Sequence, residues 1–299
     1  EKYDLKVTFS IEKEPLGTAG PLGLCRDLLT ASEDPFFMLN SDVACEFPLA
    51  DMLSFHKHHG KTGTILITPV EDPSKYGLVV SEKDTGRIEQ FLEKPPAGQS
   101  SYPSDKINAG IYILQPDVLK LIPEPTVQMS IERQIFPELV VKNAVYSFLL
   151  PGYWMDVGQP KDFLKGTILH LKSLRSRAES ATQLASGANI KGNVLIHPSA
   201  QVSPDAALGP DVVIGPNCVV EANARIQSST IMENTVVQSA ALVKNSIVGW
   251  NSKIQAWAHL EGCFLGEDVN VGAEVVLIDT TVCPHKGSNA NSFSASVQL

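Results

Sequence analysis

One aliphatic residue recurs at every sixth position through the last third of the chain, and this repeat limits the fold more than any other feature. A period of six residues fits neither an amphipathic helix nor a single hairpin. It is typical of a parallel β-helix, whose triangular coils each use three hexapeptides. The phase slips by one residue three times, and the pattern then continues. Inward-facing side chains are expected at Ile190, Ile196, Val202, Leu208, Ile214, Val220, Ile226, Ile231, Val237, Val243, Val248, Ile254, Leu260, Leu265, Val271 and Leu277.

Small and polar residues separate these aliphatic positions and predict the corners of the coils. Glycines expected at corners are Gly209, Gly215, Gly249, Gly266 and Gly272. We expect the β-helix at 189–284, a Ser- and Ala-rich linker before it at 176–188, and a flexible tail after it at 285–299. Trp250 and Trp257 fall in adjacent hexapeptides, which favours a role of this region as an assembly scaffold.

Residues 1–175 alternate short apolar runs with helical patterns, which predicts an α/β domain. The run at 35–39 suits a strand buried inside a parallel sheet and is too short for a helix. It ends in Asn40-Ser41-Asp42, and ligands of such sheets bind beyond the carboxyl ends of the strands. These residue types also favour plain turns, which is the alternative. A second acidic residue in a similar setting, Asp156, favours a ligand site.

Two local patterns complete this part of the chain. Leu5, Val7, Phe9 and Ile11 alternate with polar residues, so we expect the chain to open in a strand. A helical pattern before Gly60 carries three histidines near its end. No other ligand type is grouped with them, so a solvated helix end is favoured over a metal site. The histidines are His56, His58 and His59.

The overall composition excludes several classes of function. The formal net charge is -9 and no long basic block occurs, which argues against a nucleic acid or an anionic membrane as partner. The five cysteines are scattered without a Cys-x-x-Cys pair, so neither a disulfide framework nor a zinc site is expected, and a reducing cytoplasm is the expected compartment. No apolar run reaches the length needed to cross a membrane.

Three features of the first domain point to phosphate or sugar. Gly17 and Gly20 precede a helix pattern and let the backbone approach a flat ligand, although a plain strand-to-helix loop explains them equally. Lys94 ends a strand pattern just before a proline, where it can meet a phosphate as a point charge; an exposed strand-end lysine is the alternative. Asn108 lies inside a buried strand pattern and needs a hydrogen-bond partner, which a sugar hydroxyl would supply.

Five short motifs in this order resemble the sugar-1-phosphate nucleotidyltransferase family. Three segments further resemble the catalytic, beta-type subunits of its mannose-1-phosphate guanylyltransferases: Glu14-Pro15-Leu16-Gly17-Thr18-Ala19-Gly20-Pro21-Leu22, Pro73-Ser74-Lys75-Tyr76-Gly77 and Gly158-Gln159-Pro160-Lys161-Asp162-Phe163. The resemblance covers essentially the whole chain, apart from the tail. It implies a Rossmann-like nucleotidyltransferase domain at 1–175 followed by a β-helix that is left-handed. The motifs are Leu16-Gly17-Thr18-Ala19-Gly20, Asn40-Ser41-Asp42, Phe91-Leu92-Glu93-Lys94-Pro95, Asn108-Ala109-Gly110 and Trp154-Met155-Asp156-Val157-Gly158.

The resemblance also implies a reaction and a role for each matching residue. A phosphate oxygen of mannose 1-phosphate would attack the α-phosphorus of GTP, giving GDP-mannose and pyrophosphate, with Mg²⁺ bound by Asp42 and Asp156. Lys94 would bind the sugar phosphate, and with the two aspartates it would form the catalytic set. The sugar-phosphate side would further include Gly77, Glu93, Asn108 and Asp156. The nucleotide side would include Gly17, Thr18, Ala19 and Gly20 together with Asp42.

One departure from the family pattern affects the expected activity. The family's glycine-rich loop of the form Gly-x-Gly-Thr-Arg-Leu, and the Lys-Pro segment after it, do not occur in the printed sequence. We expect two βα units, about 60 residues at usual βαβ lengths, to be missing. The printed chain alone would then be inactive, and pyrophosphate release by that chain would disprove this.

Two other functions fit parts of the sequence. A non-catalytic subunit could use the same fold to sense the nucleotide sugar and regulate a catalytic homologue, in a homo- or hetero-oligomer built through the β-helix. A hexapeptide acyltransferase would use a coil-corner histidine, either His197 or His259, although exposed corner histidines are the more ordinary explanation.

Overall fold

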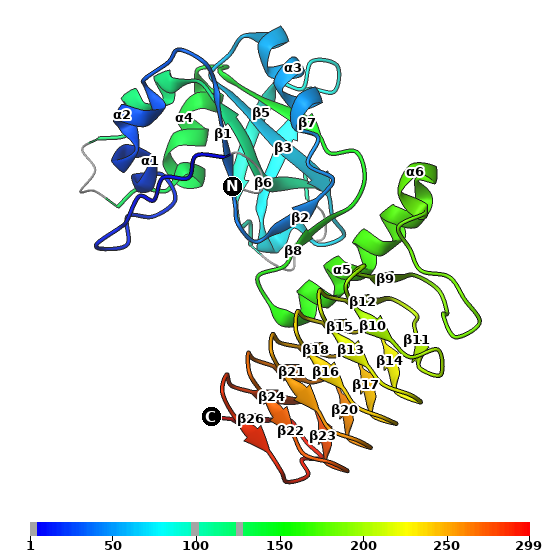
Figure 1. Ribbon diagram of the computed structural model, residues 1–299. Coiled ribbons are helices and arrows are strands. Elements are labelled where there is room, and N and C mark those ends of the chain that lie inside the picture. The colour runs from blue at the N-terminus through cyan, green and yellow to red at the C-terminus, as the bar shows by residue number, and fades with distance from the viewer. Residues whose placement is uncertain (1–4, 97–101, 124–127) are drawn as a thin grey trace. The chain divides into compact units, whose positions relative to one another are not determined.

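The structure is a computed structural model that describes residues 5–96, 102–123 and 128–299 (Figure 1). It divides into two compact units, Glu1–Trp154 and Met155–Leu299, and each is described by itself. The domain boundaries expected at 175, 188 and 284 stay predictions. No helix in the described part of the chain is long and apolar enough to cross a membrane.

A mixed sheet of six described strands forms the centre of the first unit. The order is β5-β4-β6-β3-β7, and β1 also pairs with β6. Only β3 and β7 pair in parallel; the other pairs are antiparallel. The strands of this unit are β1 (Phe36–Leu39), β2 (Val43–Cys45), β3 (Gly63–Pro69), β4 (Gly77–Ser81), β5 (Ile88–Glu93), β6 (Lys106–Leu114) and β7 (Val145–Leu149), and β8 (Trp154–Asp156) crosses the unit boundary.

Helices cover both faces of this sheet because its central strands are apolar on both sides. Ile65 and Tyr112 belong to one core with residues of α1, α2, η3 and α4, whereas Leu66 and Ile111 belong to the other core with residues of α3. The helices are α1 (Gly20–Leu24), α2 (Arg26–Leu29), α3 (Leu49–His59) and α4 (Phe136–Val141), with the 3₁₀ turns η1 (Pro73–Lys75) and η2 (Pro116–Leu121) and the π turn η3 (Ile131–Ile135).

Two strand predictions for this unit are wrong. The segment 35–39 is not inside a parallel sheet among the described residues; β1 is half-buried and antiparallel to β6. Its short apolar run matched a buried parallel strand equally well, so the sequence could not distinguish them. The opening alternation forms no strand over the described residues 5–11. Leu5 and Phe9 are 72% and 85% exposed, and no described strand lies beside them to accept their backbone hydrogen bonds.

The second unit contains a parallel β-helix, as the hexapeptide pattern predicts. Its three sheets run in register along the coils. One sheet contains β10 (Gln201–Val202), β13 (Val219–Val220), β16 (Val236–Val237), β19 (Lys253–Ile254), β22 (Asn270–Val271) and β25 (Gly287–Ser288). The next contains β11 (Ala207–Leu208), β14 (Arg225–Gln227), β17 (Leu242–Lys244), β20 (His259–Glu261) and β23 (Val276–Ile278). The third contains β9 (Val194–Ile196), β12 (Val212–Ile214), β15 (Thr230–Ile231), β18 (Ile247–Val248), β21 (Phe264–Leu265), β24 (Thr280–Val282) and β26 (Ser296–Gln298).

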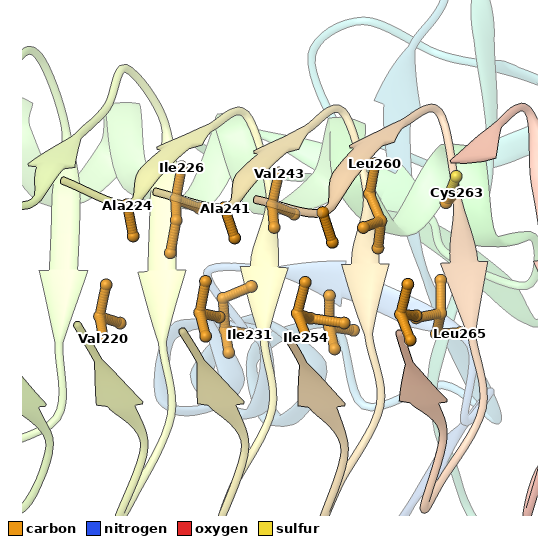
Figure 2. Close-up of a cluster of buried hydrophobic side chains, with 14 of the residues drawn as sticks. Val220, Ala224, Ile226, Ile231, Ala241, Val243, Ile254, Leu260, Cys263 and Leu265 are labelled. Carbon is orange, nitrogen blue, oxygen red and sulfur yellow. The ribbon is translucent and has the colours of Figure 1, made fainter. Parts of the chain in front are cut away.

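Aliphatic side chains from the three sheets meet inside the coils. Figure 2 shows Val220, Ile226 and Ile231 directed into the interior and stacked on the equivalent residues of the next coil. The stacking partner of Ile231 is Val248, which lies opposite it in the parallel ladder. Burying one such side chain contributes roughly 1.5–3 kcal/mol, so this stack accounts for the cohesion of the unit.

The corners of the coils carry the small and polar residues expected there. Most of the non-glycine residues that adopt positive φ in the coils are Asn or Asp, such as Asn217 at +54° and Asn234 at +59°. Short polar side chains tolerate this conformation and here also bond to each other, since the Asn217 amide donates to Asn234 at 3.1 Å. Gly249 instead allows close approach of backbone, because a Cβ atom there would lie 2.3 Å from the Gly266 carbonyl oxygen.

Ordered structure also extends into the segments predicted as linker and tail. Helix α5 (Pro160–Ser176) is followed by α6 (Ala178–Ala181), and Leu184 packs with Leu171 and Leu174 of α5. Strands β25 and β26 pair with β22 and β24. The aliphatic repeat stops before these two strands, so the sequence pattern could not predict them.

Candidate active site

Strand β6 changes its neighbour at Asn108-Ala109-Gly110. Strand β3 pairs along one edge of β6, so β1 and β4 share the other edge. On that edge β1 pairs with Ile111 to Leu114, whereas β4 pairs at Ile107. The three residues between these ladders have no strand beside them on that edge among the described residues. This interruption of the ladder leaves room for other segments of the chain to contact β6, although Ala109 and Gly110 themselves are buried.

Gly110 brings the end of β1 to this interruption. Its φ of +77° is one that only glycine adopts readily, and its carbonyl oxygen accepts a hydrogen bond from the Asn40 N–H at 2.8 Å. Asp42 lies in the turn that follows and is exposed. Trp154 also reaches this point, because its indole N–H donates to the Ala109 carbonyl oxygen at 2.9 Å. Three of the sequence motifs therefore meet at one place.

Asn108 finds its partners inside the protein. The side-chain NH₂ group of Asn108 donates to the Tyr112 hydroxyl at 2.8 Å, and its side-chain oxygen Oδ1 accepts from the Gly110 N–H at 3.0 Å. Burial raises the pKa of Tyr112, and the carboxylates of Glu132 and Glu93 raise it further. The need for a partner at Asn108 is thus met without a ligand, so that part of the argument for a sugar contact is wrong.

Gly77, Glu93 and Lys94 lie together at the end of the β4–β5 ladder. Gly77 pairs with Glu93, and a Cβ atom on Gly77 would stand 2.9 Å from the Glu93 carboxylate oxygen Oε2. Burial raises the pKa of Glu93, and the nearby Glu132 raises it further, whereas Lys94 and Arg133 act in the opposite direction. Lys94 is exposed and adopts a left-handed φ of +48°. A non-glycine residue held in that conformation is a mark of functional sites.

Glu93 and Lys94 line a pocket of about 470 Å³ on the first unit. Its walls include Glu93, Lys94, Glu132 and Arg133, so two carboxylates and two cations face one space. Tyr102 and several prolines supply the apolar wall. A mixture of apolar surface and a few charged groups is what a polar small molecule such as a sugar phosphate requires.

The 16–20 loop is fixed against the segment that leads into η3. Gly17 has φ +73°, and a Cβ atom there would lie 2.5 Å from the Met129 carbonyl oxygen. The Ala19 N–H donates to that same oxygen at 2.9 Å. The Thr18 hydroxyl donates to Glu132 at 2.6 Å. The loop therefore approaches the pocket through Glu132, whose carboxylate interacts with Glu93.

Sequence reasoning missed Ser130, Glu132 and Tyr112 as parts of this site. From the sequence, 130–136 is a short helical pattern ended by Pro137, and it gives no sign of a site. In the structure a π turn, η3, spans Ile131–Ile135, and the chain continues into α4 with Pro137 in its first turn. Single π turns are frequent at functional sites, but no sequence pattern predicts one. The available sequence signal was an acidic residue, Glu132, two positions after Ser130.

The metal-binding prediction remains open. Asp42 lies in the first unit and Asp156 in the second, so their convergence stays a prediction. No group of three or more His, Cys, Asp or Glu side chains that could hold a metal occurs in the described ranges. Asp42 is exposed, and one oxygen of Asp156 accepts from the Gly158 N–H at 3.0 Å. Two carboxylates of this kind fit Mg²⁺, which keeps several waters and also binds substrate phosphates.

The prediction of a solvated helix end at the three histidines is wrong for two of them. His56 is fully buried and bonds to the Thr64 hydroxyl at 2.8 Å, and His59 bonds to the same hydroxyl at 2.8 Å. His59 also stacks on Tyr146. Only His58 is exposed. The pattern showed a helix end, and it could not show that β3 and β7 supply partners there.

The two coil histidines differ in their contacts. His197 contacts the Ser199 hydroxyl at 2.8 Å. The Nε2 atom of His259 lies 3.7 Å from the Glu261 carboxylate, which is beyond hydrogen-bond distance, and this atom is buried without a hydrogen-bond partner among the described residues. Trp250 and Trp257 are 49% and 67% exposed, as expected for an assembly surface, although no partner chain tests that role.

Comparisons with known proteins identify the family. The family model described as "Nucleotidyl transferase" matches residues 1–173, and the one described as "GMPPB C-terminal domain" matches residues 190–297. The chain is 51% identical over 294 residues to a mannose-1-phosphate guanyltransferase from Schizosaccharomyces pombe, covering 97% of this chain and 79% of that protein. It is 48% identical over 288 residues to the mannose-1-phosphate guanylyltransferase catalytic subunit beta from Danio rerio, covering 96% and 78%.

A plant relative matches over the same span. The chain is 47% identical over 301 residues to mannose-1-phosphate guanylyltransferase 1 from Arabidopsis thaliana, covering 100% of this chain and 81% of that protein. The predicted fold, a nucleotidyltransferase domain followed by a parallel β-helix, is confirmed, while the left hand of the β-helix stays a prediction. The chain belongs to the nucleotidyl transferase family, within its group of mannose-1-phosphate guanylyltransferases.

Proposed function

We propose that the protein transfers a guanylyl group from GTP to mannose 1-phosphate, forming GDP-mannose and pyrophosphate. The observation that carries this proposal is the pocket in which Glu93 and Lys94 lie beside Glu132, the residue that holds the 16–20 loop. A sugar-phosphate subsite and a loop suited to a base thus lie next to each other. The choice of guanine and mannose rests on the names of the relatives.

Lys94 and Glu93 would bind the two ends of the sugar phosphate. The Lys94 ammonium group is exposed at the pocket and can neutralise the phosphate, while the Glu93 carboxylate can accept hydrogen bonds from sugar hydroxyls. Gly77 leaves space for the Glu93 side chain, since any Cβ atom there would overlap it. Asn108, bonded to Tyr112 and Gly110, would shape the neighbouring wall.

The 16–20 loop would hold the nucleotide. Gly17 and Thr18 are exposed, and Gly17 lets this loop backbone pack directly on the Met129 carbonyl, so the loop presents backbone on which a flat base could lie. Asp42 and Asp156 would hold Mg²⁺ together with phosphate oxygens. When bound, this ion neutralises charge on the triphosphate and stabilises the leaving pyrophosphate.

The chemistry is an in-line displacement that needs no covalent nucleophile. A phosphate oxygen of mannose 1-phosphate forms a bond to the α-phosphorus of GTP, and the bond from that phosphorus to the bridging oxygen of pyrophosphate breaks. Lys94 reduces the repulsion between the two anionic substrates and aligns the attacking oxygen. Positioning and electrostatic stabilisation of this kind supply most of the acceleration in such reactions.

Pyrophosphate release by the purified protein tests the proposal. For a protein that carries the family's glycine-rich loop, we expect turnover with GTP and mannose 1-phosphate, loss of turnover on chelation of Mg²⁺, and much slower reaction with ATP, UTP or glucose 1-phosphate. The printed chain alone, which does not contain that loop, is expected to show no turnover. Preference for another nucleotide or sugar would overturn the substrate assignment. Tight binding of GDP-mannose without any turnover would instead support a regulatory subunit.

Two further proposals concern the setting of the enzyme. We place it in the cytoplasm because its cysteines form no pattern that requires an oxidising compartment. We propose an oligomer built through the β-helix, because Trp250 and Trp257 are exposed there. Light scattering of the protein and of a Trp257→Ser variant would test the second proposal, which a monomeric parent protein would refute.

A further inference from the structure

Glu132 is the point at which the 16–20 loop and the sugar-phosphate pocket meet. Its carboxylate oxygen Oε2 accepts two hydroxyl hydrogen bonds, from Thr18 at 2.6 Å and from Ser130 at 2.8 Å. The residue is half-buried, and it belongs to neither the loop nor the β5 segment. It does line the pocket formed by Glu93 and Lys94.

The direction of these hydrogen bonds is fixed by the backbone. The Ile131 N–H donates to the Thr18 hydroxyl oxygen at 2.9 Å, so the single hydroxyl proton of Thr18 is directed to Glu132. The Ser130 hydroxyl likewise accepts from the Arg133 N–H at 3.2 Å and donates to Glu132. Both hydroxyls therefore depend on one carboxylate oxygen. Hydrogen bonds to an ionised carboxylate are stronger than those between neutral groups.

The π turn η3 explains how one side chain serves both neighbours. Glu132 is its second residue, and Ser130 is its N-cap. The Ser130 N–H donates to the Gln134 side chain at 2.8 Å, which secures the start of the turn. A π turn costs backbone stability relative to an α-helix and persists mostly where function requires it.

We propose that Glu132 is a positioning residue for the nucleotide, which holds the 16–20 loop in its binding conformation through Thr18. This inference rests on the proposed function for the identity of the ligand. Thr18 is exposed, and without Glu132 its hydroxyl has no other acceptor among the described residues. The loop would then occupy several conformations, only one of which binds the nucleotide, and apparent affinity would fall accordingly.

A double-mutant cycle between Thr18 and Glu132 tests this. Glu132→Ala and Thr18→Val should each raise the Kd and the KM for GTP about tenfold, the size of one hydrogen bond to a charged group, and change kcat much less. The double variant should also be weakened about tenfold, because both changes remove the same bond. Glu132→Gln and Thr18→Ser keep an acceptor and a donor, so we expect them to stay within about threefold of the parent.

Glu138→Ala is the matched control. Glu138 pairs with Lys142 on the exposed side of α4, so its removal should leave Kd and KM unchanged. Three results would overturn the proposal: a hundredfold loss in the double variant, a Glu132→Gln variant as weak as Glu132→Ala, or a lowered melting temperature of Glu132→Ala with unchanged Kd for GTP. The second would mean that the charge itself contacts substrate.

Failure of the proposed function would look different. Turnover of the unaltered protein is measured first with several nucleoside triphosphates. If GTP is not the preferred one, the substrate assignment falls, and the same cycle run with the preferred nucleotide still decides the role of Glu132. If no turnover occurs, the Thr18/Glu132 double-mutant cycle is measured with nucleotide Kd values from titration calorimetry alone.

Discussion

Asn40 and Gly110 are in contact: the Asn40 N–H bonds to the Gly110 carbonyl oxygen at 2.8 Å, and a Cβ atom on Gly110 would stand 2.9 Å from the Asn40 side-chain nitrogen. Asn40, the first residue of the Asn40-Ser41-Asp42 motif, therefore packs against β6 at the residues between its pairing with β1 and its pairing with β4. The position of Asp42 depends on this contact, although Asp42 itself is exposed.

Replacing Gly110 by alanine should disturb both stability and activity. The φ of +77° penalises any side chain, and the new methyl group would also displace Asn40. We expect a loss of about 2–4 kcal/mol in the free energy of unfolding, since strained backbone costs of order 1–3 kcal/mol and overpacking adds to it. Denaturant unfolding measures this loss, and turnover should fall with it.

Gly60 provides the matched control for this prediction. It has φ +60°, but a Cβ atom there would meet nothing within 4 Å. Gly60→Ala should therefore cost about 1 kcal/mol from conformation alone. Equal losses for the two variants would show that packing on Asn40 contributes nothing.

Substitutions of Lys94 should separate its charge from its backbone conformation. Both Lys94→Ala and Lys94→Gly remove the ammonium group, so each should reduce turnover by about a hundredfold, as for loss of one positioned charge in a site. Because Lys94 has φ +48°, the glycine variant should be more stable than the alanine variant by about 1–2 kcal/mol. Melting curves and pyrophosphate release measure the two effects.

Lys83, an exposed lysine of the β4–β5 hairpin, is the control for charge. Lys83→Ala should leave turnover unchanged. Comparable activity of the Lys94 and Lys83 variants would remove Lys94 from the catalytic set.

The β-helix was predictable from sequence because its pattern is physical and repetitive. Each inward position must be apolar and of similar size, and this requirement recurs in every coil, for example at Ile214, Ile231 and Val248. The additional strands β25 and β26 carry no such repetition and were missed. Strand β1 was misassigned because an apolar run of four or five residues does not specify the direction of its neighbour.

The candidate site was predictable only where motifs of the family mark it. Gly77, Glu93 and Lys94 lie together as the resemblance implied. Glu132 belongs to no quoted motif, and its role depends on contacts with Thr18 across 114 positions of sequence. Such a contact can be seen only once the chain is folded. The same holds for Tyr112, the internal partner of Asn108.

Truncating an inward side chain of a central coil should destabilise the protein strongly. Ile231 is fully buried and stacks on Val248. Ile231→Ala should cost about 2–5 kcal/mol through lost burial and the cavity left behind. Val297→Ala, in a side chain that is 63% exposed, should cost less than about 0.5 kcal/mol. Chemical denaturation of both variants checks this, and similar losses would contradict the stacked core.

The paired histidines of α3 should make stability fall at acidic pH. Burial lowers the pKa of His56, and burial together with the nearby cations lowers the pKa of His59 to about 4. In the unfolded chain both titrate near pH 6.5. Between these values the unfolded state binds more protons than the folded state, so stability decreases as the pH falls from about 6.5 to 4.

Variants separate the contribution of His56 and His59 to the pH dependence of stability from that of the carboxylates, which titrate in part of the same pH range. A His56→Gln/His59→Gln double variant should lose the part of the pH slope that lies between about 6.5 and 4, even if its stability at pH 7.5 is lower. Replacing the exposed His58 by Gln should leave the slope as it is. Urea unfolding at a series of pH values measures the slope. A double variant that kept the full slope would contradict the prediction, because it would mean that both histidines are protonated in the folded protein. The structure disfavours that state, since both rings bond to the same Thr64 hydroxyl.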